Sequence, residues 1–210
     1  MQHDELKVRL NELENNYNGK EFLSIVNKIK KDKTNDDELL RKIENLSRKR
    51  FEEKGSFTLG LFSGNLLEII VTIAAVVLAF RVNADLMLYF VTLILMATLH
   101  PLSHYLTGSL FGIRFTHYYL NGPARIEPTL RINYSSYLKA KGVKRALMHA
   151  SGVIGTLAAP LIVALIALDK GESGVAINLM YFFLLLIVFE LLTSTKIGDL
   201  MKAKREYGYR

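Results

Sequence analysis

Four long apolar runs constrain this chain more than any other feature of its sequence. A helix needs about 20 consecutive apolar residues to cross the hydrocarbon core of a bilayer, and each run reaches that length. The pattern predicts an all-α polytopic membrane protein with four transmembrane helices. The predicted spans are residues 59–80, 86–108, 146–168 and 173–195.

The Lys and Arg residues lie almost entirely on one side of these spans. The segment before the first span, the 109–145 connection and the tail from Lys196 together carry twenty-five of them, whereas the two other connections carry two. Because basic loops stay on the cytoplasmic side, both termini are predicted to be cytoplasmic. The same distribution accounts for the net charge of +7, so the lipid bilayer is the expected partner and nucleic acid is not.

The polar residues 1–57 precede the apolar part of the chain and are predicted to form a cytosolic helical N-terminal segment. Leu39, Leu40 and Ile43 recur at helical spacing, which favours amphipathic helices here. Residues 58–210 are then predicted to form one transmembrane domain. The chain has no cysteine, which excludes disulfides, thiolate metal ligands and a cysteine nucleophile.

The connection between the second and third spans is rich in β-branched and aromatic residues. Asn121–Gly122 is a strong hairpin-turn signal, so a short cytoplasmic β-loop is predicted over residues 111–138. Pro123 and Pro128 restrict their strands to an edge of the pairing. Such a loop offers its edge to an extended peptide, or alternatively covers the helices as a plain lid.

His100 and His104 lie inside the second apolar run, four residues apart. Side chains at i and i+4 share one face of a helix, so two imidazoles so placed can bind one zinc ion. A polar group in a membrane is expensive and is usually functional. Zinc needs at least one further protein ligand, and the candidates are Glu68, Glu190 and Asp199.

Depth along the spans separates these three carboxylates. At 1.5 Å per residue, Glu190 and Glu68 fall near the level of the histidines. Asp199 falls several residues deeper, at the cytoplasmic edge. It reaches the histidines only if its segment is tilted, unwound or folded back.

Three stretches in order resemble the site-2 protease family of intramembrane zinc metalloproteases. "HPLSHYLTG" resembles the family's HExxH helix, "HASGVIGT" at residues 149–156 resembles its second conserved motif, and "FELLTSTKIGDL" at residues 189–200 resembles its third. The resemblance covers roughly residues 59–205 and implies a site-2-protease-like core. It also implies zinc as cofactor and His100, His104 and Asp199 as ligands, with Glu190 as an alternative third ligand.

The departures from the family pattern fall on the chemistry. Pro101 replaces the glutamate that acts as general base, and Pro has no side-chain oxygen to accept a proton. Val153 and Thr156 replace the Pro and Asn of the second motif. Asn121, Gly122 and Thr156 are the candidates for contacts with a substrate.

Two functions therefore compete. One is a pseudoprotease that binds transmembrane segments or partners without cutting them, and the sequence favours it because the base has changed. The other is an active intramembrane metalloprotease that uses Glu190 or Glu68 as a relocated base. Metal transport is a third and weaker hypothesis, since four spans and two histidines are its main support.

Overall fold

The computed structural model describes residues 2–55, 57–82, 84–121, 127–193 and 198–210. Helices predominate, and a small antiparallel sheet takes one strand from before the first long apolar helix and two strands from between the second and the third. The helices are α1 Gln2–Asn15, α2 Gly19–Asp32, α3 Asp37–Glu53, α4 Leu61–Arg81, α5 Asp85–Leu110, α6 Tyr134–Lys139, α7 Gly142–Asp169, α8 Ser173–Thr193 and α9 Asp199–Tyr207; the strands are β1 Thr58–Gly60, β2 Phe115–Asn121 and β3 Glu127–Ile132.

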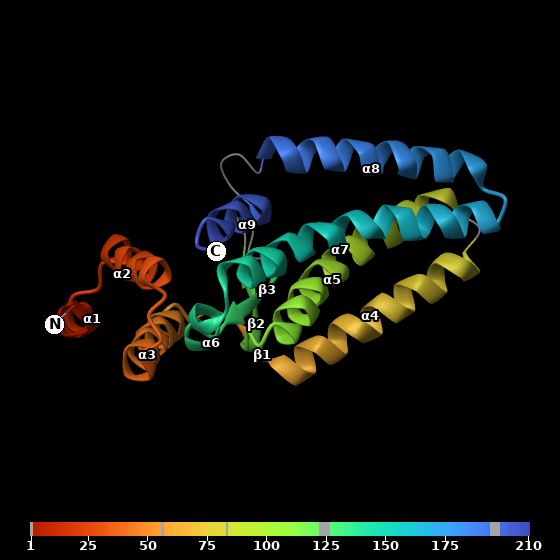
Figure 1. The fold of residues 1–210 in the computed structure, drawn as a ribbon. Helices are drawn as coiled ribbons and strands as arrows, with labels where there is room; N and C mark the ends of the chain where they lie inside the picture. Colours follow the sequence, from red (N-terminus) through yellow and green to blue (C-terminus); the bar gives the residue numbers. More distant parts are fainter. Residues whose placement is uncertain (1, 56, 83, 122–126, 194–197) are drawn as a thin grey trace.

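Four of these helices, α4, α5, α7 and α8, are long and apolar enough to cross a membrane, which confirms the prediction of four apolar spans. They lie side by side in the order α8, α7, α5, α4 (Figure 1). The outer pair, α4 and α8, expose rows of large apolar side chains, whereas α5 and α7 pack closely against each other. This distribution suits a bundle whose outer faces contact lipid.

Two of the predicted spans begin more than one residue away from the start of the helix in the structure. The first span was predicted from residue 59, but Leu59 lies in β1 and pairs with Tyr118, so the helix begins at Leu61. The third was predicted from residue 146, but α7 already begins at Gly142 because a polar first turn continues the helix. Hydropathy locates the apolar part of a helix and misses a polar turn at its end.

The sheet has three strands in the order β1–β2–β3, one more than the predicted hairpin. Pro128 lies on β3, an edge strand, as its missing N–H requires. The predicted β-loop ran to residue 138, but Asn133 accepts a hydrogen bond from the Ser136 N–H and starts the short helix α6. The last part of the predicted loop is therefore helical.

The N-terminal helices form one hydrophobic core with the sheet. Asn18 and Asp36 cap α2 and α3 through their side chains, and the apolar faces that these helices bury agree with the predicted amphipathic pattern. Their buried leucines and isoleucines continue into Phe115, Tyr118 and Leu130 of the sheet. The helices α1, α2 and α3 thus pack at the end of the bundle that carries the sheet (Figure 1).

A buried ionic cluster ties three parts of the chain together. Glu206 on α9 is fully buried; its Oε1 accepts a hydrogen bond from Lys30 Nζ on α2 at 2.5 Å, and its Oε2 accepts one from Arg145 Nε on α7 at 2.7 Å. Burial opposes ionisation of Glu206, but the two neighbouring cations hold the pKa of its carboxyl below the usual range. The cluster fixes α9 against both α7 and the N-terminal helices.

Replacing Glu206 by Gln is expected to destabilise the packing of α9 against α2 and α7 by about 3 kcal/mol, because two buried cations lose the charge that compensates them. The thermal unfolding midpoint of the detergent-purified chain measures this loss. Glu53→Gln is the matched control, since Glu53 pairs with Arg50 on the surface and its loss leaves no buried charge. Equal midpoints for the two variants would contradict this account of the cluster.

Candidate metal centre

His100 and His104 project from α5 toward α7, and their Nε2 atoms lie 3.2 Å apart. Gly152 on α7 leaves the space that the two rings occupy. A Cβ at residue 152 would lie 2.9 Å from Cε1 of His100 and would overlap the His104 ring. The close packing of α5 on α7 thus depends on a glycine opposite the two histidines.

Asp199 reaches the histidines because α9 packs against α7. The helix α8 ends at Thr193, and α9 begins at Asp199 beside the end of α7 that lies near the sheet (Figure 1). Gly198 precedes it with φ of 109°, a backbone conformation that favours glycine. Asp199 Oδ2 lies 3.0 Å from Nε2 of His104 and 3.2 Å from Nε2 of His100.

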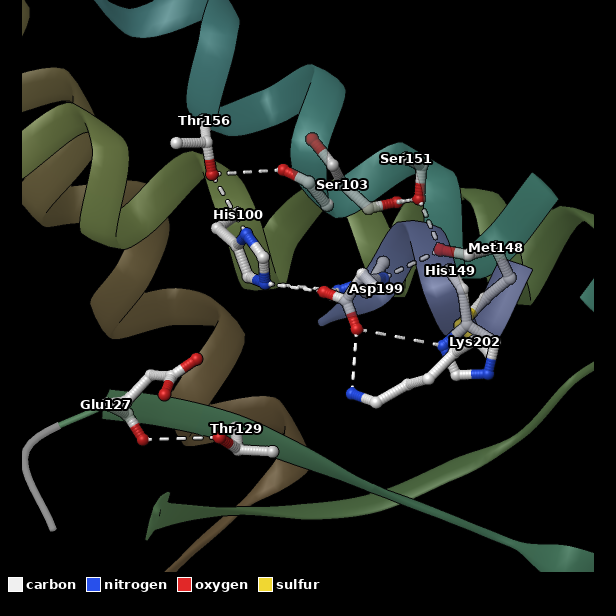
Figure 2. Close-up of polar contacts among 12 residues, drawn as sticks. His100, Ser103, Glu127, Thr129, Met148, His149, Ser151, Thr156, Asp199 and Lys202 are labelled. Atoms are coloured by element: carbon white, nitrogen blue, oxygen red, sulfur yellow. Dashed lines mark hydrogen bonds and ion pairs between the residues drawn. The ribbon is translucent and has the colours of Figure 1, made fainter. Parts of the chain in front are cut away.

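Hydrogen bonds on the far side of each imidazole orient the rings. His104 Nδ1 lies 2.7 Å from the carbonyl oxygen of Met148, so Nδ1 carries the proton and donates it. His100 Nδ1 lies 2.9 Å from the Thr156 hydroxyl, which itself donates to the carbonyl of Gly152 (Figure 2). With both Nδ1 atoms donating, both Nε2 lone pairs face Asp199.

Three electron-pair donors therefore converge on one point, where repulsion between them calls for a cation. A tetrahedral zinc ion, bound at its usual distances to nitrogen and oxygen, holds its ligand atoms roughly 3.3 Å apart. The separations of 3.0–3.2 Å between the Nε2 and Oδ2 atoms match this spacing closely. His100, His104 and Asp199 form a group that could hold a metal ion.

The Asp199 carboxylate is also supported on its other side. Lys202 Nζ donates to Asp199 Oδ1 at 2.8 Å, and His149 Nδ1 lies 4.0 Å from the same oxygen. Burial disfavours the charged form of the Asp199 carboxylate, whereas the ammonium group of Lys202 favours it. The group is therefore an anion, ready to bind a cation, at neutral pH.

The cavity beside the three ligands is bounded by β3 and has a volume of about 110 Å³. Asn121, a predicted substrate contact, lines it together with Glu127, Thr129 and Lys202. Figure 2 shows the Glu127 side chain on the side of β3 that faces the ligand cluster. At roughly 30 Å³ per water molecule, the cavity accommodates a few waters or part of a peptide.

The other predicted site residues lie in different places. Thr156 contacts His100 rather than the open cavity. Glu68 is buried on α4 in a separate pocket beside Tyr118. Glu190 is half-buried near the end of α8 and belongs neither to the metal-ligand group nor to the cavity lining. Gly122 lies outside the described residues.

Sequence reasoning did not identify Lys202 and Glu127 as parts of this site. Lys202 had a usable signal, because it follows Asp199 by three residues and so shares a helix face with it. Glu127 had no such signal, since only the register of β3 against β2 brings it to the cavity.

Comparison with protein-family models, with curated proteins and with solved structures gives no match to this chain.

Replacing Thr156 by Val is expected to weaken zinc binding by about 10- to 100-fold, because it removes the hydrogen bond that orients His100 while keeping the side-chain volume. Competition with a fluorescent zinc chelator measures the dissociation constant. Thr92→Val is the matched control: Thr92 is a buried residue of α5 whose hydroxyl bonds only its own helix. Equal affinities for the two variants would show that Thr156 does not orient the ligand.

Proposed function

We propose that this chain is a site-2-protease-like intramembrane zinc-binding protein that holds extended segments of other membrane proteins without the family's usual general base. The observation that carries the proposal is the convergence of His100, His104 and Asp199. These residues come from two helices that are far apart in sequence, and they stand at the positions where the first and third motifs resemble the family. When zinc is bound there, it acts as a Lewis acid toward a carbonyl or a water molecule.

The middle motif supports the same assignment. This motif lies on α7. Thr156 at its end contacts His100, and the carbonyl of Met148, directly before the motif, contacts His104. Gly152 within it makes room for the imidazoles. Each of the three stretches that resemble the family thus has a physical part in building the site.

The position of the usual base argues against ordinary catalysis. Pro101 lies directly after His100 on α5 and is buried beside the cavity. Its side chain cannot take a proton from water, and loss of a general base commonly costs about 10²–10⁴ in rate. Binding without cleavage is therefore the proposed activity.

The edge of β3 is the proposed seat for the bound segment. Within the described residues, β3 pairs with β2 alone, and Pro128, Thr129 and Leu130 line the metal cavity. An extended chain that paired with this edge would pass the metal ligands. A helical transmembrane segment would have to unwind locally to bind in this way.

The orientation that we propose places both termini, the sheet and the metal centre at the cytoplasmic side. The support for it is the excess of Lys and Arg in the segments that flank the four spans on that side. The lipid bilayer is then the first partner of the protein, and the bound membrane segment is the second.

Metal analysis of the purified chain by mass spectrometry tests the zinc site. We expect near-stoichiometric zinc in the parent protein, loss of zinc in His100→Ala and Asp199→Asn, and retention in Glu190→Ala. Loss of zinc in Glu190→Ala but not in Asp199→Asn would make Glu190 the third ligand. A parent protein that takes up no metal, even when zinc is supplied during purification, would overturn the metal-binding assignment.

A hydrolytic alternative has one specific observation in its favour. Apart from Asp199, Glu127 is the acidic residue among the described residues that line the metal cavity. A carboxylate here would accept the proton of an attacking water as the water oxygen adds to the peptide carbonyl carbon. It would return that proton to the amine as the C–N bond breaks.

Cleavage of a reconstituted single-span membrane protein separates the two functions. If the parent cleaves it, Glu127→Gln is expected to lower the rate by about 10²–10⁴-fold while zinc content stays unchanged. Glu190→Gln is the comparison, since it tests the base expected from depth alone. Binding of the substrate without cleavage by the zinc-loaded parent would leave the pseudoprotease as the function.

A further inference from the structure

A second cavity lies behind the metal centre, between the N-terminal helices and the sheet. Its walls come from α2, α3, β2, β3, the α6 region, α7 and α9, and its volume is about 400 Å³. This is within the range of pockets that bind small organic ligands. We call it the basic chamber, and the metal-binding assignment does not explain it.

The basic chamber is lined by positive charge. Four of its lining residues are basic, and among the described residues that line it none is Asp or Glu. Two of the four are deeply buried, so their charges are poorly screened by water. The basic residues are Lys30, Arg131, Lys202 and Arg205.

The carboxylates behind the chamber wall do not neutralise this charge. Glu206 alone faces three cations: Lys30 at 2.5 Å, Arg145 at 2.7 Å and Arg205 at 3.5 Å. One negative charge against three positive charges leaves an excess of two. The excess lies at the end of the chamber formed by α2 and α9.

The other two lining cations are matched one for one. Arg131 Nη1 donates to Glu44 at 2.9 Å, and Lys202 donates to Asp199 at 2.8 Å. The local excess over the whole chamber therefore remains two positive charges, counting histidine as neutral. A bound metal ion at the neighbouring centre would raise this excess further.

Arg131 has unused hydrogen-bonding capacity. Its residue is 5% exposed, and its Nε and Nη2 have no hydrogen-bond partner among the described residues. A buried donor left unpaired costs about 1–3 kcal/mol. Its guanidinium instead lies over the Phe51 ring, 5.5 Å from the centroid. Both nitrogens are covered in the structure, so a ligand in the chamber recovers that cost when the Arg131 side chain turns toward it.

Aromatic side chains form much of the remaining wall. Phe51, Tyr119, Tyr134 and Tyr137 line the basic chamber, and Leu23 and Val26 add apolar surface. Flat aromatic faces suit the organic part of a ligand, while the cations suit its charged part. An inorganic ion alone would leave most of this volume unfilled.

We propose that the basic chamber binds a small phosphate ester. A phosphate monoester carries about −1.5 to −2 charges at neutral pH and three strong acceptor oxygens. Its charge matches the local excess of two, whereas a single carboxylate would neutralise half of it. Lys202 and His149 line both this chamber and the metal cavity, so the bound ester lies directly behind Asp199.

Isothermal titration of the full-length purified chain tests this site, with AMP and inorganic phosphate as probes and adenosine as the uncharged comparison. We expect saturable binding of AMP, competition by inorganic phosphate and no binding of adenosine. Adenosine binding as tightly as AMP would overturn the assignment of a phosphate site. The absence of saturable binding for every phosphate probe, soluble or in vesicles, would overturn it too.

Two pairs of variants locate the ligand. Asn27→Asp adds a negative charge to the chamber lining, and Ser24→Asp adds the same charge one turn earlier on α2, outside the lining. Arg205→Gln removes a lining cation, and Lys204→Gln removes its neighbour outside the lining. The first member of each pair is expected to weaken AMP binding at least ten-fold, while the control stays within two-fold of the parent. Equal weakening within both pairs would contradict the location.

The phosphate group could belong to a soluble molecule or to a lipid. Titration with AMP of the chain reconstituted in phosphatidylcholine bilayers, with and without phosphatidic acid, distinguishes these sources. If phosphatidic acid displaces AMP from the parent and from Ser24→Asp but not from Asn27→Asp, the phosphate site stands and its ligand is a lipid headgroup. AMP binding that phosphatidic acid leaves unchanged assigns the site to a soluble ester.

Discussion

The buried carboxylate of Glu206 makes the contacts on which the packing of α9 against α2 and α7 depends. Glu206 and Asp199 are seven residues apart on α9, which is two helical turns, so they lie on the same face. Glu206 binds Lys30 and Arg145, and this anchors α9 against α7 and the N-terminal helices. Asp199 is thereby held at the two histidines. One ionic cluster therefore positions a candidate metal ligand and joins the N-terminal helices to the bundle.

The burial of the site between α5, α7 and α9 explains why its polar groups are so completely hydrogen-bonded. A polar group removed from water is costly unless it finds a partner. The two imidazoles and Asp199 each have a partner on the far side, so their Nε2 and Oδ2 lone pairs face one point. A small-residue stretch on α7 makes this possible, because a Cβ at Gly152 or Gly155 would collide with α5. Close helix packing and ligand convergence have the same cause here.

The sequence allowed some parts of the site to be predicted and not others. The spacing of His100 and His104 predicts a shared helix face directly, because local geometry decides it. Asp199 was predicted as a ligand only through the resemblance of its motif to the family, because depth along the spans placed it several residues from the histidines. The packing of α9 against α7 brings it to them. Glu127 and Arg131 have no local signal, since strand register and the packing of the N-terminal helices bring them to their cavities.

By itself, the sequence determined the four apolar helices, the edge position of Pro128 and the pair of imidazoles, because hydropathy, a missing N–H and a four-residue spacing act over short stretches of chain. Only the tertiary structure decided that Asp199 meets those imidazoles, that β1 adds a third strand and that a basic chamber lies behind the metal centre. Each of these joins residues far apart in sequence. Their proximity depends on how whole elements pack, which no local pattern encodes.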